Sequence, residues 1–230
     1  MAIVEHLFPD AEALTAALAE RVSEALEAAV GARGRASLVV SGGRTPRPLF
    51  ETLAQRDLPW SQVHATLADE RWVDADSLDS NEGMLRPSLL QGQAAAVHFV
   101  PLKNEAPDPE LGRAECAAAL AGMPWPLDLV LLGMGADGHT ASLFPRVAGE
   151  ALNPNCADTC RAVYPESAPH PRMSLTASAL LASRVLILHF TGEEKLAVYR
   201  QALEPGPIEE LPVRVVLRQP KVPVELWWSP

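Results

Sequence analysis

Short runs of apolar residues alternate with amphipathic segments along the whole chain of 230 residues. Each run is bounded by glycine, proline or polar turn residues, which is typical of strands covered on both faces of a parallel sheet. The runs predict strands at residues 36–40, 63–68, 97–100, 127–133, 184–190 and 224–228. Because helices between successive strands form βαβ units, the alternation favours an α/β fold with a mostly parallel central sheet and helices on both faces.

The first predicted helix spans residues 10–31. Asp10 is a plausible N-cap, and apolar residues spaced four apart from Leu14 to Leu26 give the helix one apolar face. Gly31 and Gly34 are expected to end it. Further helices are predicted at residues 46–55, 81–90, 109–120 and 193–203.

The composition limits the class of protein. Hydrophobic residues make up 48% of the chain, as in ordinary globular proteins. The proline-rich segment 101–109 reads as a loop rather than a linker, so residues 1–230 are expected to form one domain. A formal net charge of −10 argues against broad nucleic-acid binding and against adhesion to an anionic membrane.

A cytoplasmic location is expected, because the sequence shows no secretory leader and no apolar run of about 18 residues. Three cysteines, Cys116, Cys156 and Cys160, fit a reducing compartment better than a disulfide framework. Cys156 and Cys160 stand four apart, but no nearby pair of histidines completes a zinc site. We therefore expect unpaired thiols and no metal.

The stretch GMGADGHTASLFP, which follows the apolar run LDLVLL at residues 127–132, contains three glycines in the spacing G-x-G-x-x-G. A Rossmann dinucleotide site needs a long helix after such a turn, yet Pro145 comes only seven residues after Gly138. The stretch also contains Asp137 and His139, which a pyrophosphate loop does not need. An acidic residue and a histidine at the end of a strand indicate a different kind of site.

In open parallel sheets, ligands bind beyond the carboxyl ends of the strands. The segment SGGRTP follows the strand 36–40, and its Gly42 and Gly43 allow the backbone to approach a ligand closely. Thr45 is a plausible N-cap, and Pro46 suits the first helical position. The free N–H groups of such a turn predict a phosphate site, with a plain tight turn as the alternative.

Four segments of the chain resemble, in order, the motifs of the 6-phosphogluconolactonase family. They are SGGRTP, ADERWVDADSLDSNEGMLRPSLL, LDLVLLGMGADGHTASLFP and PRMSLTASALLASRVLILHFTGEEK. That family shares one sugar-phosphate superfamily of Rossmann-like fold with the glucosamine-6-phosphate deaminases. The resemblance implies an enzyme that hydrolyses 6-phospho-D-glucono-1,5-lactone to 6-phosphogluconate, the second step of the oxidative pentose phosphate pathway. Because a lactone is already an activated ester, we expect no metal and no cofactor.

The resemblance also implies roles for particular residues. The substrate phosphate would lie on the glycine turn, with two distant cations closing around it: Gly42, Gly43, Arg44, Thr45, Arg172 and Lys195. Arg44 stands where the superfamily often has a serine, which removes a hydroxyl but leaves the backbone donors unchanged. Asp69 and Arg71 would line the sugar end of the pocket, and Asn81 would support the loop.

His139 would be the general base that activates water, and Asp137 would help to place it or the substrate. A histidine with an ordinary pKa near 6.5 is largely neutral at pH 7, so it can accept a proton from water and return it to the ring oxygen. His189 lies within a predicted strand and is expected to be a structural core residue. Trp227 and Trp228 are expected to cover the sheet.

Two alternatives remain open from the sequence. The deaminase/isomerase branch continues its GxGxDGH motif into an Asn-Glu pair, but Leu143 and Phe144 stand there in this chain, which favours hydrolysis. A non-catalytic sugar-phosphate sensor would keep the phosphate site without the base. The expected partner is a small phosphorylated sugar lactone, with functional coupling to glucose-6-phosphate dehydrogenase.

Overall fold

The structure is a computed structural model that describes residues 3–230. Its central sheet has the strand order β1-β10-β9-β6-β2-β3-β5, and all neighbouring strands in it run parallel. The strands are β1 (Val4–Leu7), β2 (Ala36–Val40), β3 (Val63–Leu67), β5 (His98–Val100), β6 (Leu127–Leu132), β9 (Ser183–Thr191) and β10 (Val224–Ser229). The predicted α/β class with a mostly parallel sheet is therefore confirmed.

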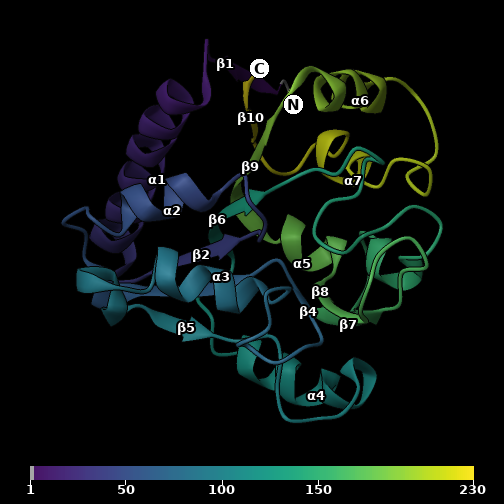
Figure 1. Ribbon diagram of the computed structural model, residues 1–230, viewed down its shortest axis with the longest axis horizontal. Coiled ribbons are helices and arrows are strands. Elements are labelled where there is room, and N and C mark those ends of the chain that lie inside the picture. Colours follow the sequence, from purple (N-terminus) through teal and green to yellow (C-terminus); the bar gives the residue numbers. More distant parts are fainter. Residues whose placement is uncertain (1–2) are drawn as a thin grey trace.

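Helices cover both faces of this sheet (Figure 1). One face carries α1 (Ala11–Arg33), α2 (Arg47–Leu53) and α3 (Asn81–Ser88), and the other carries α5 (Ala177–Leu181), α6 (Glu193–Leu203) and α7 (Arg214–Leu217). The remaining helix, α4 (Pro109–Leu120), packs against strand β7 at one end of the molecule. Among the residues described, no helix has both the length and the apolar character needed to cross a bilayer.

The first helix shows which local signals were decisive. Asp10 caps α1, because its carboxylate accepts a hydrogen bond from the Ala13 N–H at 2.8 Å. Of the two glycines expected to end the helix, Gly34 is confirmed as the C-cap with a left-handed φ of 70°, whereas the end predicted at residue 31 is wrong because the helix continues to Arg33. A glycine inside a helix costs only about 1 kcal/mol relative to alanine, and packing of the apolar face offsets that cost.

A second, three-stranded antiparallel sheet was not predicted. It consists of β4 (Asp69–Arg71), β8 (Arg172–Leu175) and β7 (Cys160–Val163) in the order β4-β8-β7. The sequence DER of β4 has no apolar alternation, so its strand conformation depends on pairing with β8, about a hundred residues away in the chain. Strand β1 and the short helices α5 and α7 were also not predicted.

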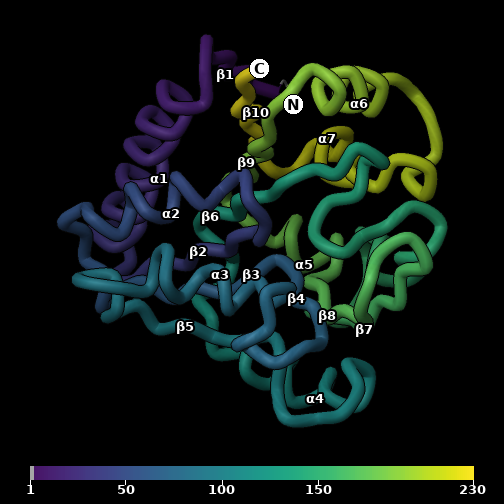
Figure 2. Tube along the Cα trace, in the orientation of Figure 1, coloured from purple at the N-terminus to yellow at the C-terminus, as the bar shows by residue number. Residues whose placement is uncertain are grey.

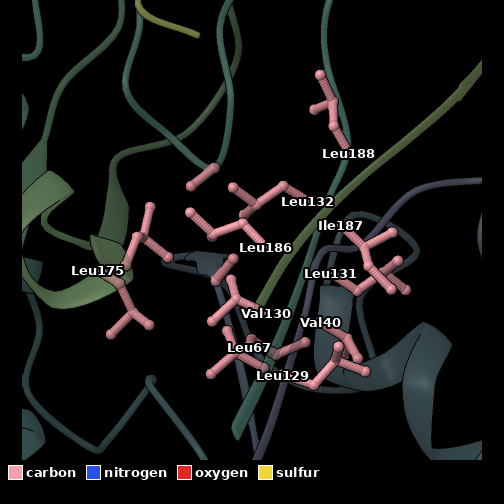
Figure 3. Close-up of a cluster of buried hydrophobic side chains, with 14 of the residues drawn as sticks. Val40, Leu67, Leu129, Val130, Leu131, Leu132, Leu175, Leu186, Ile187 and Leu188 are labelled. Carbon is pink, nitrogen blue, oxygen red and sulfur yellow. The ribbon is translucent and has the colours of Figure 1, made fainter. Parts of the chain in front are cut away.

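The core lies along the central strands, whose apolar side chains pack together (Figure 3). The clustered side chains are Val40, Leu67, Leu129, Val130, Leu131, Leu132, Leu175, Leu186, Ile187 and Leu188, all at most 2% exposed. The two ends of the described chain meet at one edge of the sheet, where β1 pairs with β10 (Figure 2). The packed apolar side chains of β2, β6 and β9 thus anchor the loops that follow these strands.

Candidate functional site

A cavity of about 300 Å³ lies at the carboxyl ends of β2, β6 and β9. The small sheet and the start of α3 complete its walls, so segments far apart in the sequence meet there. Every predicted site residue except Asp137 lines it: Gly42, Gly43, Arg44, Thr45, Asp69, Arg71, His139, Arg172 and Lys195. The side chain of Asp137 instead reaches this cavity through His139, to which it is hydrogen-bonded.

The glycines of the loop after β6 make room for His139. A Cβ atom on Gly135 would lie 2.2 Å from the His139 Nδ1, so only glycine leaves space for the imidazole. Gly138 has a left-handed φ of 76°, and its Cβ would also collide with Leu211. The Gly135 N–H closes the turn by donating to the His139 carbonyl at 2.9 Å. The G-x-G-x-x-G spacing therefore builds a tight histidine-bearing turn.

Asp137 fixes the orientation and tautomer of His139. Its Oδ1 lies 2.6 Å from the His139 Nδ1 and also accepts the His139 backbone N–H at 3.1 Å. Burial alone would raise the pKa of Asp137, but its hydrogen bonds with His139 lower that pKa below its ordinary value. An ionised Asp137 can only accept, so the neutral imidazole carries its proton on Nδ1 and keeps a lone pair on Nε2. Phe144 stacks on the ring with centroids 4.4 Å apart.

The loop between β2 and α2 presents backbone donors to the cavity. Gly43 has a left-handed φ of 97°, and among residues 3–230 the N–H groups of Gly43, Arg44 and Thr45 donate to no backbone carbonyl. The expected N-cap at Thr45 is wrong, since Pro46 holds the cap position without any side-chain capping bond. Pro48 would be the third residue of a helix capped by Thr45, and it has no N–H to donate.

Asn81 at the start of α3 supports the glycine turn. Its side chain occupies the space beside Gly42, where a Cβ would lie 1.9 Å from the amide oxygen, and its Nδ2 donates to the Asp69 carbonyl at 2.8 Å. Glu70, only 1% exposed, accepts the N–H groups of Asn81 at 2.8 Å and Glu82 at 2.7 Å. Burial raises the pKa of Glu70 against the opposing effect of these donors. Glu70 thereby positions α3, a function that sequence reasoning missed.

Asp69 joins the histidine loop to the small sheet. Its Oδ2 accepts a hydrogen bond from the buried Ser142 hydroxyl at 2.5 Å and lies 3.8 Å from the Arg172 Nη1. The Arg172 Nε and Nη2 donate to the carbonyls of His170 and Pro169, at 3.3 and 3.1 Å. Backbone carbonyls therefore hold the Arg172 guanidinium in place, and its Nη1 is the nitrogen that faces the Asp69 carboxylate. Sequence reasoning did not identify Ser142, because a serine in a loop carries no distinctive signal.

Lys195 enters the cavity from the first turn of α6. A cation is electrostatically unfavourable at a helix N-terminus, where the macrodipole is positive. Burial lowers the pKa of Lys195, with Glu194 opposing that effect. A partly buried ammonium group at the start of a helix destabilises the fold, so we infer that Lys195 is there for its role in the site. Among the residues described, no group of three or more His, Cys, Asp or Glu side chains is placed to hold a metal ion.

His189 lies near the end of β9 and lines the same cavity. The prediction of burial was right, since the residue is 4% exposed, but a purely structural setting was not the whole of it, because the residue also lines the cavity. Burial, followed by the charge of Lys195, lowers the pKa of His189 to about 4. Its place near the carboxyl end of a parallel strand was the signal that could have identified it.

We expect the protein to lose stability as the pH falls from 6.5 towards 4 because of His189. The unfolded chain takes up a proton on this residue near pH 6.5, whereas the folded chain resists it until about pH 4. The free energy of unfolding should fall by up to about 1.4 kcal/mol per pH unit from this residue alone. Urea unfolding of wild type and His189→Leu at pH 7, 6 and 5 measures this, and parallel pH profiles would contradict it.

Comparison with known proteins identifies the family of the chain. A sequence profile described as glucosamine-6-phosphate isomerases/6-phosphogluconolactonase matches residues 9–228. A 6-phosphogluconolactonase of Mesorhizobium japonicum is 44% identical over 98% of this chain and 94% of its own length. One of Pseudomonas putida is 41% identical over 100% and 94%. The crystal structure of a 6-phosphogluconolactonase from Shewanella baltica OS155 superposes with a TM-score of 0.96 at 46% identity, covering 100% of this chain and 98% of that one.

Proposed function

The chain belongs to the glucosamine-6-phosphate isomerase/6-phosphogluconolactonase family, and we propose that it hydrolyses 6-phospho-D-glucono-1,5-lactone to 6-phosphogluconate. The observation that carries the proposal is the Asp137–His139 pair beside a cavity that also holds Lys195 and the free N–H groups after β2. This arrangement offers a base for water and an anion site for a phosphate within one small cavity.

In the proposed reaction, His139 moves the protons. Its Nε2 lone pair accepts a proton from a water molecule whose oxygen attacks the lactone carbonyl carbon. The tetrahedral intermediate then collapses, the bond from the carbonyl carbon to the ring oxygen breaks, and the protonated Nε2 returns its proton to that oxygen. Asp137 stabilises the imidazolium between these two steps. Because a lactone is an activated ester, the reaction needs no covalent nucleophile.

The phosphate end of the substrate supplies binding energy that positions the carbonyl. Gly43, Arg44 and Thr45 would donate their N–H groups, and Lys195 would add a cation, at a distance from the reacting bond. Asp69 and Arg71 would line the sugar end, where Arg71 faces Arg172 across the β4–β8 pair. Arg71 lines the cavity with a guanidinium side chain and is a candidate donor for the developing oxyanion.

Ring opening of an amino-sugar phosphate is the second candidate, and the residues that stand in place of the Asn-Glu pair argue against it. Leu143 is fully buried and Phe144 is 4% exposed and stacked on the imidazole. The deaminase route needs a carboxylate there as a second proton carrier, and the structure places apolar side chains in that position. A cytoplasmic location, and functional coupling to the dehydrogenase that produces the lactone, complete the proposal.

The activity is tested by following the lactone itself. Glucose 6-phosphate, NADP and a dehydrogenase generate 6-phosphogluconolactone in situ, and its decay is compared with the spontaneous rate. We expect acceleration in proportion to the amount of this protein added. Decay at the spontaneous rate, accompanied by ammonia release from glucosamine 6-phosphate, would replace the proposal with the deaminase activity. Binding of 6-phosphogluconate without turnover of either compound would instead indicate a sensor.

A further inference from the structure

His189 has a hydrogen-bonding capacity that the fold leaves unused. Its Nδ1 is buried and has no hydrogen-bond partner within the described chain, although the residue lines the cavity. Buried polar side-chain atoms are nearly always paired, so an unpaired one requires an explanation. A leucine would fill this position in the strand without that cost.

The burial of Nδ1 determines which nitrogen of His189 can contact a ligand and which tautomer the neutral imidazole adopts. Because Nδ1 is shielded from solvent, contact with a molecule in the cavity falls to Nε2. If Nδ1 carried the proton, a buried N–H would remain unpaired, which is rare in folded proteins. The tautomer with the proton on Nε2 instead buries only a lone pair and offers a donor to the cavity.

The sheet register places this donor on the face where α2 begins. His189 is aligned with Trp227 of β10, two residues beyond Glu225, so both β10 side chains share its face of the parallel sheet. Glu225 is bonded to Arg21 of α1 at 2.7 Å, which identifies this as the face covered by α1 and α2. Lys195 is close enough for its charge to lower the pKa of His189. His189 and Lys195 therefore line one cavity and lie near enough for their charges to interact.

We propose that the Nε2–H of His189 donates a hydrogen bond to the phosphate group of the substrate, beside the ammonium of Lys195. A neutral imidazole adds a donor without adding a second positive charge next to a lysine that is already partly desolvated. The identity of the sugar phosphate rests on the proposed function, but the phosphate contact itself does not require turnover. The two claims can therefore fail separately.

Isothermal titration with 6-phosphogluconate, gluconate and inorganic phosphate tests the contact. We expect His189→Leu to raise the Kd for 6-phosphogluconate by about 10- to 100-fold, the effect of losing a hydrogen bond to a charged group. The Kd for inorganic phosphate should rise in parallel, whereas binding of gluconate should change little. For the lactone, the same variant should raise KM and leave kcat nearly unchanged.

A matched pair of amide variants identifies the nitrogen. The side-chain amide of glutamine reaches the position of Nε2, so His189→Gln should restore most of the affinity lost in His189→Leu. Asparagine reaches only the position of Nδ1, so His189→Asn should remain as weak as the leucine variant. These two variants keep the test valid if His189→Leu fails to fold, and His98→Leu, at an exposed histidine on β5, is the control.

An unchanged Kd for 6-phosphogluconate in folded His189→Leu would overturn the proposal. An equal loss for gluconate would also overturn it, because the contact would then be with the sugar. Affinity retained by His189→Asn and lost by His189→Gln would refute the assigned nitrogen. If wild type fails to hydrolyse the lactone but the affinity differences persist, only the proposed function is lost.

Discussion

Replacing His139 by alanine is expected to lower kcat for lactone hydrolysis by about 10²- to 10⁴-fold, the usual contribution of a general acid/base residue. KM should change little, because the proposed phosphate contacts lie on other segments: the β2–α2 loop, β9 and α6. The decay of lactone generated in situ from glucose 6-phosphate measures both parameters. His98→Ala, outside the cavity, is the matched control.

The pairing of Asp137 with His139 gives this prediction a second readout. Asp137→Asn can donate to the His139 Nδ1, which would move the imidazole proton to Nε2 and remove the lone pair that accepts the proton from water. It should therefore lower kcat strongly by itself and add little in the double variant with His139→Ala, because the two residues act as a unit. Unchanged turnover in His139→Ala would remove this residue from the mechanism, and full additivity would separate the roles of the two.

Phe144 explains how the histidine loop remains precise in an open site. The ring stacks on His139, and the Cζ of the Arg172 guanidinium lies 5.5 Å from the centroid of the same ring. The small sheet and the histidine loop are thus joined by an aromatic contact as well as by the Ser142–Asp69 hydrogen bond. Both links depend on the position of β4 and β8 beside the central sheet, so the small sheet holds the substrate side of the site in place.

The parts of this architecture that the sequence predicted are those encoded locally. Strand β2 and helices α4 and α6 have the predicted bounds, because apolar runs, an Asp108 cap and proline punctuation act over a few residues. The Asp137–His139 pair could be predicted for the same reason, since its members are two residues apart in the sequence. Their roles in catalysis stay predictions until they are measured.

The parts that the sequence did not predict depend on contacts between distant segments. Asp69 meets Ser142 and Arg172 only because β4 pairs with β8, and no periodicity in the charged stretch DER indicates that pairing. His189 looked like a core residue because its neighbours in β9 are apolar, and only the sheet register shows which face its ring occupies. The carboxylate of Glu70 beneath the start of α3 is a further long-range contact of this kind.

These long-range contacts also determine which cationic residue should be replaced to test the proposed phosphate site. Arg172→Ala would remove hydrogen bonds to the carbonyls of His170 and Pro169 and leave Asp69 without its cationic neighbour. Lost activity in that variant could arise from a distorted site rather than from lost phosphate binding. Lys195 has no salt bridge within residues 3–230, so its removal disturbs less of the surrounding structure.

We expect Lys195→Ala to raise KM for the phosphorylated lactone by about 10- to 100-fold, the effect of one charge-assisted contact of about 1.5–3 kcal/mol. Activity on glucono-1,5-lactone, which has no phosphate, should change little. Because the lysine is partly desolvated in the first turn of α6, its removal should leave the melting temperature unchanged or raise it. Lys221→Ala, at an exposed lysine outside the cavity, is the control. Equal losses on both lactones, or a fall in melting temperature that accounts for the lost activity, would show that Lys195 supports the fold rather than the phosphate.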